Sequence, residues 1–257
     1  MKPLFDSAGA SVLDSLADAD ALLAFDFDGT LAPIVAQRTQ ARMRPSTARL
    51  FHALCTQARC VVISGRARAD VSQRLGDAPV LAVIGNHGAD DGRVVPGSTA
   101  ALMREVTGAL ARELEVGDLD LEDKDFSLSI HFPHTPGIDT AVRYNRVLAT
   151  LQALGPRLRL LAGHYVINVL PAESMHKGDA LQGVLSQYRA DRALFVGDDH
   201  TDEDVFRLRL PGLTGVRVGY SPSSRADYFI AGQDDIDRLL ETLLQRRSRS
   251  RPSWAAG

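Results

Sequence analysis

Short apolar runs alternate with amphipathic stretches along most of the chain. Residues 22–25 and 60–63 are apolar at every position, which is typical of strands buried on both faces of a sheet. Other segments repeat apolar residues every three to four positions, as amphipathic helices do. The predicted strands are 21–27, 60–64, 80–86, 193–199 and 215–219, and the predicted helices are 45–58, 65–75, 176–188, 201–208 and 235–247. This alternation predicts an α/β fold with a Rossmann-like, mainly parallel sheet between two layers of helices.

The pattern changes between residues 91 and 168. Two amphipathic helices are predicted at 98–115 and 138–154, and strand 126–132 alternates apolar and polar residues, as an antiparallel strand with one solvated face does. Further strands are predicted at 158–163 and 164–170. We therefore expect residues 91–168 to form an inserted α+β cap domain within a discontinuous core, residues 1–90 and 169–257. The Arg-, Ser- and Pro-rich tail, residues 246–257, is predicted to be disordered.

Composition excludes little but indicates no unusual partner. The net charge of −3 does not favour binding to nucleic acid or to a membrane surface. No apolar run approaches the ~20 residues of a membrane helix, and the N-terminal segment lacks the apolar centre of a signal peptide. We therefore expect a cytoplasmic monomer with no nucleic-acid or membrane partner. Cys60 leads into an apolar run and is expected to be a buried thiol, and no disulfide framework is expected from Cys55 and Cys60.

Carboxylates follow two of the predicted strands. Asp26 and Asp28 end the first strand, and Asp198 and Asp199 end a later one, with Asp202 one turn beyond. In open parallel sheets such strand ends share one edge, where ligands bind. At ~4 Å and an effective dielectric of ~20, two like charges repel by about 4 kcal/mol, and a divalent cation removes that repulsion. An all-oxygen set with room for water suits Mg²⁺ better than Ca²⁺ or zinc.

Two further polar residues favour a phosphoryl site at the same edge. Lys177 opens a predicted helix, where the helix dipole disfavours a cation, so an anion nearby would explain it. Ser64, at the end of the second strand, adds a hydroxyl and neighbouring backbone donors. Together with the acids, these groups predict a site in which a carboxylate attacks a phosphoryl group and cations neutralise its oxygens.

These residues resemble the signature of haloacid dehalogenase-type phosphatases. The Asp-x-Asp-Gly-Thr motif occurs at residues 26–30, and Ser64, Lys177 and "GDDHTDED" follow in the order of that superfamily. Within it, "FDFDGTLAPI", "VVISGR", "GNHGA" and "VGDDHTDEDVF" resemble the trehalose-6-phosphate phosphatase family. The insertion also lies where that family carries its cap.

The resemblance implies hydrolysis of trehalose 6-phosphate to trehalose and phosphate through an aspartyl-phosphate. It implies that Asp26 is the nucleophile and that Asp28 is the general acid and base. Mg²⁺ would be held by Asp26, the Asp28 carbonyl and Asp198, with Asp199 and Asp202 joining or orienting its water shell. The phosphoryl oxygens would be bound by Ser64, Gly65, Arg66 and Lys177.

The predicted cap also carries part of the family pattern. The stretch "LEDKDFSLSIHF" resembles the sugar-contacting pattern of the family, with Glu122 and Lys124 in the contacting positions. The family places a further Glu three residues before a Pro, and Asn168 holds that position here. Asn168 would then be the sugar-binding residue, and Glu173 is an alternative.

Three other functions remain open. Another capped sugar-phosphate phosphatase, acting on sucrose, mannosylglycerate or hexose phosphates, would share the core chemistry. A phosphoglucomutase-like transferase usually carries its cap between the first two motifs, but only about 35 residues separate Asp28 from Ser64 here. A catalytically silent binding protein would normally have lost the acids or Lys177.

Overall fold

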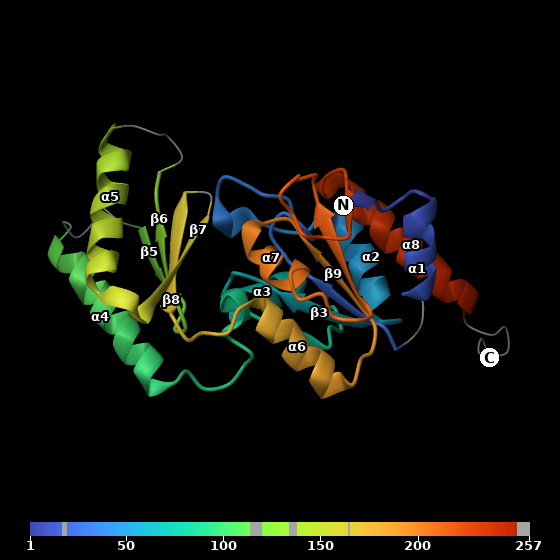
Figure 1. Cartoon of the computed structure of the whole chain (residues 1–257), viewed down its shortest axis with the longest axis horizontal. Coiled ribbons are helices and arrows are strands. Elements are labelled where there is room, and N and C mark those ends of the chain that lie inside the picture. The colour runs from blue at the N-terminus through green and yellow to red at the C-terminus, as the bar shows by residue number, and fades with distance from the viewer. Residues whose placement is uncertain (17–19, 114–119, 134–137, 164, 251–257) are drawn as a thin grey trace. The chain divides into compact units, whose positions relative to one another are not determined.

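The computed structural model describes residues 1–16, 20–113, 120–133, 138–163 and 165–250, which are shown in Figure 1. The chain divides into two units. The core unit comprises Met1–Asp91 and His176–Gly257, and the cap unit comprises Gly92–Met175. The cap unit extends past residue 168, the expected boundary, because strand β8 (Val166–Pro171) pairs with other strands of that unit.

The core unit contains a seven-stranded sheet in which every pairing is parallel. Its strand order is β1-β11-β10-β9-β2-β3-β4. The strands are β1 (Lys2–Pro3), β2 (Leu22–Phe25), β3 (Arg59–Ile63), β4 (Ala82–Ile84), β9 (Ala193–Gly197), β10 (Leu213–Val218) and β11 (Tyr228–Ile230). This arrangement confirms the predicted α/β class with a parallel-sheet core.

Side-chain alternation along β2 explains why helices cover both faces of this sheet. Leu23 and Phe25 pack into one apolar cluster, and Leu22 and Ala24 pack into another. The first cluster contains residues of α1 (Ser7–Ser15), α2 (Pro45–Cys55), α3 (Arg68–Leu75) and α8 (Ile236–Ser250). The second contains residues of α6 (Lys177–Tyr188) and α7 (Glu203–Phe206). A strand buried on both faces can be apolar throughout, as the sequence of β2 is.

The strand order reverses at β2. From β2 the chain continues to β3 and β4 on one side, whereas β9, β10 and β11 lie on the other side. Ligands of open α/β sheets bind outside the carboxyl ends of the strands at such a switch point. The residues that directly follow β2, β3 and β9 are therefore placed where a ligand would bind.

The cap unit contains an antiparallel sheet with the order β5-β6-β8-β7. Its other strands are β5 (Asp120–Asp123), β6 (Leu128–His131) and β7 (Leu158–Gly163), and its helices are α4 (Gly97–Glu113) and α5 (Ile138–Ala153). The sequence pattern did not predict β5, because "DLED" carries acids at three of its four positions. The two helices pack on the sheet through a buried apolar cluster that includes Val106, Leu110, Val147 and Leu151.

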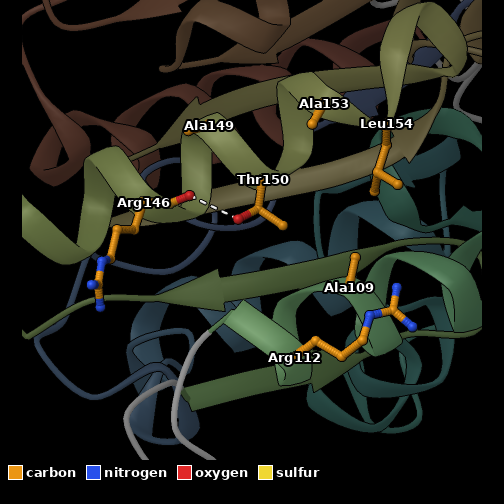
Figure 2. A pocket seen from close by; sticks show the side chains of 7 residues that line it. All are labelled: Ala109, Arg112, Arg146, Ala149, Thr150, Ala153 and Leu154. Carbon is orange, nitrogen blue, oxygen red and sulfur yellow. Dashed lines mark hydrogen bonds between the residues drawn. The ribbon is translucent and has the colours of Figure 1, made fainter.

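A groove of about 400 Å³ runs between α4 and α5 (Figure 2). Its lining includes Ala109, Ala149 and Ala153, with Arg112 and Arg146 beside them. Alanine side chains are too short to fill the space between two helices. The packing of this helix pair therefore depends on the apolar side chains that face the sheet rather than on those along the groove.

The two ends of the chain differ from the sequence prediction. The sequence pattern did not predict β1 or α1. A two-residue edge strand such as β1 is too short to show a period. The prediction of a disordered tail from residue 246 was wrong for its first residues, since α8 continues to Ser250. Arg247 is buried there and donates to the carbonyl oxygens of Gln57 (3.1 Å) and Leu16 (3.2 Å). Residues 251–257 of the predicted tail lie outside the described residues.

No helix among the described residues is both long enough and apolar enough to cross a lipid bilayer.

Candidate active site

Asp26 directly follows β2 and is buried, with 5% of its surface exposed. Its backbone N–H donates to the carbonyl oxygen of Val196 at 2.8 Å, so the main chain stays in register with β9 as the strand ends. Gly29 then has φ of +76°, and a Cβ there would lie 2.1 Å from Oδ2 of Asp198. Only glycine allows the chain to turn at this point without displacing that carboxylate.

Lys177 is the first residue of α6, and its side chain is 2% exposed. Its Nζ lies 3.1 Å from Oδ1 of Asp26 and 2.7 Å from Oδ1 of Asp202. Burial alone would lower the pKa of Lys177, but the carboxylates of Asp202 and Asp26 outweigh burial and raise that pKa. Lys177 is therefore a permanent cation between two carboxylates.

Three carboxylates form a cluster around this lysine. Oxygen atoms of Asp26, Asp198 and Asp202 all lie within 4.8 Å of one another. Burial raises the pKa of Asp26 well above its ordinary value, although Lys177 opposes the shift. Burial and the charge of Asp202 raise the pKa of Asp198 to about 7. These raised pKa values mean that ionising all three acids beside one lysine is costly, and a hard divalent cation would offset that cost.

The other two predicted metal-binding acids direct their side chains elsewhere. Asp28 forms a two-point ion pair with Arg66, at 2.6 Å to Nε and 2.7 Å to Nη2. Asp199 accepts from the backbone N–H and from the ring of its neighbour His200. Burial would raise the pKa of Asp199, but these hydrogen bonds from His200 lower it to about 2. The carboxylates of Asp28 and Asp199 thus lie outside the three-acid cluster.

The turn after β3 carries Ser64, Gly65 and Arg66 and is held by the segment after β4. The backbone N–H of His87 donates to the Ser64 carbonyl (2.9 Å), and that of Asn86 donates to the Arg66 carbonyl (2.7 Å). Gly65 packs against the imidazole of His87, where a Cβ would lie 2.4 Å from Cε1. Asn86 and His87 are buried with φ of +50° and +57°, a strained conformation for residues other than glycine. This strain is retained because the segment fixes the turn.

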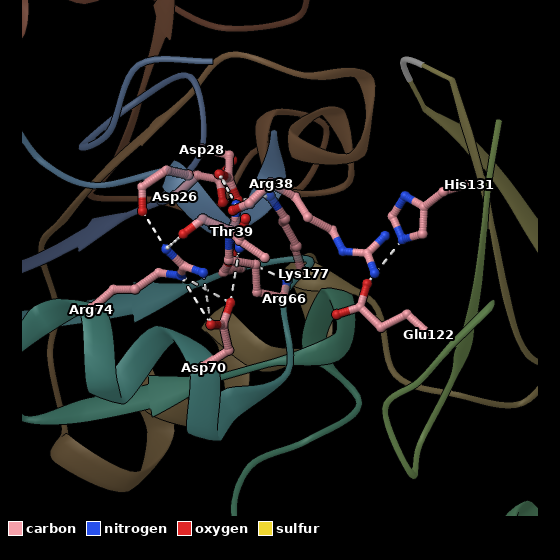
Figure 3. Close-up of polar contacts among 12 residues, drawn as sticks. Asp26, Asp28, Arg38, Thr39, Arg66, Asp70, Arg74, Glu122, His131 and Lys177 are labelled. Atoms are coloured by element: carbon pink, nitrogen blue, oxygen red, sulfur yellow. Dashed lines mark hydrogen bonds and ion pairs between the residues drawn. The ribbon is translucent and has the colours of Figure 1, made fainter. Parts of the chain in front are cut away.

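Sequence reasoning missed two residues of the site. Asp70 accepts from Arg66 and Arg74, and the three side chains continue the ion pair of Asp28 into α3 (Figure 3). Arg66, Asp70 and Arg74 follow one another at intervals of four residues with alternating charge, a helical ion-pair pattern that the sequence shows.

The predicted sugar-binding residues Glu122 and Asn168 lie in one row across the cap sheet. Glu122 is opposite Ser129 on the neighbouring strand, and Ser129 is opposite Asn168. Oε2 of Glu122 lies 2.9 Å from Nε2 of His131 (Figure 3), and Ser129 donates to Asn168 at 2.6 Å. Directly opposed residues face the same side of a sheet, so this row presents polar side chains on one face.

The remaining cap residues lie in turns. Lys124 is in the turn between β5 and β6, where its N–H donates to the Ser127 carbonyl at 2.9 Å. Glu173, the alternative to Asn168, follows the end of β8 and is exposed. Of the two alternatives, only Asn168 is on the row that contains Glu122.

The parallel sheet with acids at its switch point places the chain in the haloacid dehalogenase-type fold class. One solved structure that it resembles is the C-terminal domain of Candida albicans trehalose-6-phosphate phosphatase, with a TM-score of 0.76 at 21% identity over 95% of this chain and 98% of that one. More specifically, the chain belongs to the trehalose-phosphatase family, whose model matches residues 24–224.

Curated relatives of similar sequence are longer than this chain. A trehalose-phosphate phosphatase of Mycobacterium avium is 30% identical over 254 residues, covering 93% of this chain and 61% of the relative. The Mycobacterium tuberculosis protein of the same name is 32% identical over 265 residues, covering 93% and 66%. The chain thus spans about three-fifths of the length of these relatives.

Proposed function

We propose that this chain is a Mg²⁺-dependent phosphatase that hydrolyses trehalose 6-phosphate to trehalose and phosphate. The observation that carries the proposal is the buried carboxylate of Asp26, 3.1 Å from a buried lysine and clustered with two further acids at the switch point of the sheet. Membership of the trehalose-phosphatase family supports the same reaction.

In this mechanism a carboxylate oxygen of Asp26 attacks phosphorus while the bond from phosphorus to the sugar oxygen breaks. Asp28 donates a proton to the departing sugar oxygen, and trehalose leaves. Asp28 then takes a proton from a water molecule that attacks the aspartyl-phosphate, which releases phosphate and restores Asp26. The general acid and the nucleophile are two residues apart, so they can act on opposite sides of one phosphorus atom.

The remaining groups neutralise charge. Mg²⁺ would be held by the clustered carboxylates of Asp26 and Asp198 and by the Asp28 carbonyl, with Asp202 joining or orienting its water shell, and would offset the charge of the phosphoryl oxygens. Lys177 and the Ser64 hydroxyl would bind those oxygens. The Arg66 side chain is paired with Asp28, and its backbone N–H donates to Oγ of Ser64 at 3.3 Å. Arg66 would therefore act by orienting the Ser64 hydroxyl, and Gly65 would act through its backbone N–H.

Substrate choice would depend on the polar row of the cap sheet. We assign contacts with the sugar to Glu122, Lys124 and Asn168. A phosphate-release assay over trehalose, sucrose, glucose and mannosylglycerate phosphates tests the assignment. The highest kcat/KM is expected for trehalose 6-phosphate. A higher kcat/KM for another ester would show that this other ester is the substrate. The cytoplasmic location and the monomeric state stay predictions from composition.

Removal of divalent metal is expected to abolish phosphate release, and Mg²⁺ should restore it. The physical reason is the uncompensated charge of the Asp26, Asp198 and Asp202 carboxylates. The same charge means that Mg²⁺ should raise the melting temperature of the EDTA-treated protein, because a ligand that binds only the folded state stabilises it. Full turnover in excess EDTA, with no melting shift on adding Mg²⁺, would contradict the proposed metal site.

Lys124→Ala is expected to lower kcat/KM for trehalose 6-phosphate by about 10- to 150-fold, equivalent to a charge-assisted hydrogen bond of ~1.5–3 kcal/mol. The kcat/KM for p-nitrophenyl phosphate should stay within about twofold, since this ester has no sugar to hold. Lys2→Ala, an exposed lysine on the edge strand, is the matched control. Equal losses on both substrates would show that Lys124 supports the fold or the chemistry instead.

A further inference from the structure

The guanidinium of Arg66 is held on three sides within the core unit. It donates to Asp28 through Nε and Nη2, to Asp70 through Nη1 at 2.9 Å, and through Nη2 to the Arg38 carbonyl at 3.1 Å. Its side chain is 14% exposed, and its charge lies 5.9 Å from the centre of the buried Phe27 ring. Arg66 therefore has one well-defined orientation, and in that orientation it fixes both oxygens of Asp28.

Asp70 connects this guanidinium to a second arginine. It lies one helical turn from both Arg66 and Arg74, and it accepts from Nε of Arg74 at 3.0 Å and pairs with Nη2 of Arg74 at 2.9 Å. Arg74 in turn donates to the carbonyl oxygens of Thr39 and Ala41 (Figure 3 labels Arg38 and Thr39 beside these side chains). The chain of contacts thus runs from Asp28 through Arg66, Asp70 and Arg74 to the backbone of residues 39–41.

The charge of Asp70 is maintained. Burial would raise the pKa of Asp70, but hydrogen bonds from Arg74 and Arg66 lower it overall. Without this carboxylate, two guanidinium groups would lie close together, and among the described residues Arg66 would keep Asp28 as a carboxylate partner while Arg74 would keep carbonyl acceptors alone. Their repulsion would turn Arg66 away from the orientation that grips Asp28.

We propose that Asp70 is a positioning residue for the reaction: it orients Arg66, and Arg66 holds the carboxyl group of Asp28 so that a proton carried on an oxygen lone pair that Arg66 does not occupy is directed to the departing sugar oxygen. This proposal rests on the proposed function, in which Asp28 is the general acid. The simpler alternative is that these partly buried i,i+4 pairs only stabilise α3.

The two alternatives differ in their dependence on the leaving group. A sugar alkoxide needs a proton as it departs, whereas p-nitrophenolate is stable enough to leave without one. The ratio kcat/KM includes only the steps up to departure of the alcohol, so later hydrolysis of the aspartyl-phosphate does not enter it. A displaced general acid should therefore affect kcat/KM for the sugar ester alone.

The test compares kcat/KM of Asp70→Asn and wild type on trehalose 6-phosphate and on p-nitrophenyl phosphate. A fall of about 10- to 100-fold is expected on the sugar ester, part of the 10²- to 10⁴-fold contribution of a general acid. The value for p-nitrophenyl phosphate should stay within about threefold. Asp70→Glu keeps the charge but moves it by one methylene away from Arg66, so a smaller loss confined to the sugar ester is expected, and this variant carries the test if Asp70→Asn does not fold. Asp77→Asn, just beyond α3 with a side chain 97% exposed, is the matched control.

A kcat/KM on the sugar ester within about twofold of wild type in the folded variant would overturn the proposal, as would equal losses on both esters. The wild-type measurements test the proposed function separately. If the wild type prefers another sugar phosphate, the substrate assignment fails, and the same comparison is made on that ester. If it cleaves p-nitrophenyl phosphate but no sugar ester, the proposed function and the role of Asp70 both fail.

Discussion

Asp26→Asn is expected to lower phosphate release by at least about 10⁴-fold, in line with the loss seen when an enzymic nucleophile is removed. The amide has the shape of the carboxyl group but cannot attack phosphorus, and it is a poor ligand for Mg²⁺. The measurement is steady-state phosphate release with circular dichroism as a check on folding. This position is sensitive because Asp26 lies at the centre of the cluster, beside both Lys177 and the other acids.

Asp191→Asn is the control for this substitution. Asp191 is exposed and precedes β9, whereas the site follows that strand, so the same chemical change there should leave activity unaltered. If folded Asp26→Asn protein kept more than about a tenth of the wild-type rate, a change of only ~1.4 kcal/mol in the barrier, Asp26 would not be the nucleophile.

Lys177→Met is expected to abolish activity and to lower the free energy of unfolding by about 3–5 kcal/mol, because removing one partner of a buried charge cluster leaves the others uncompensated. Methionine keeps most of the side-chain volume, so a packing defect would add little. The measurement is urea unfolding in EDTA. Added Mg²⁺ should recover part of the loss, since it offers the three acids another cation.

Lys2→Met tests whether loss of any lysine has this effect; Lys2 is exposed, and its variant should unfold like wild type. A loss below about 1 kcal/mol for Lys177→Met would show that the acids are not stabilised by Lys177 but are protonated or solvated in the folded protein.

The sequence predicted those features of the fold that depend on local pattern. The uniformly apolar β2 and β3 and the amphipathic α2 and α6 were readable, because burial on two faces or on one stripe leaves a periodic signature. Parallel pairing then follows from the alternation of strands and helices, and it places Asp26 and Asp198 on one edge. Edge strand β1 and the polar β5 have no such signature, and only their neighbours in the sheet define them.

The sequence did not predict which charged side chains pair with one another in the fold. Nothing in "DFDGT" shows that the Asp28 side chain meets Arg66 while that of Asp26 meets Lys177, since both pairs form between segments distant in the sequence. Arg247 illustrates the same limit. In sequence it belongs to a basic, polar tail, but in the structure it is buried because the carbonyl groups of Gln57 and Leu16 accept its hydrogen bonds. Composition describes a segment by itself and does not include acceptors supplied from elsewhere.

Gly88 adds a point about how this chain is assembled. A Cβ on Gly88 would lie 2.4 Å from the carbonyl oxygen of His176. Gly88 lies just before the chain leaves the core unit, and His176 is the residue at which the chain returns to it, so the two ends of the insertion are in contact within the core unit. Topologically, the whole of Gly92–Met175 is then a single loop closed at its base. Its length and its fold can change without altering the register of any core strand. Evolution could therefore exchange the cap unit while leaving the acid cluster untouched.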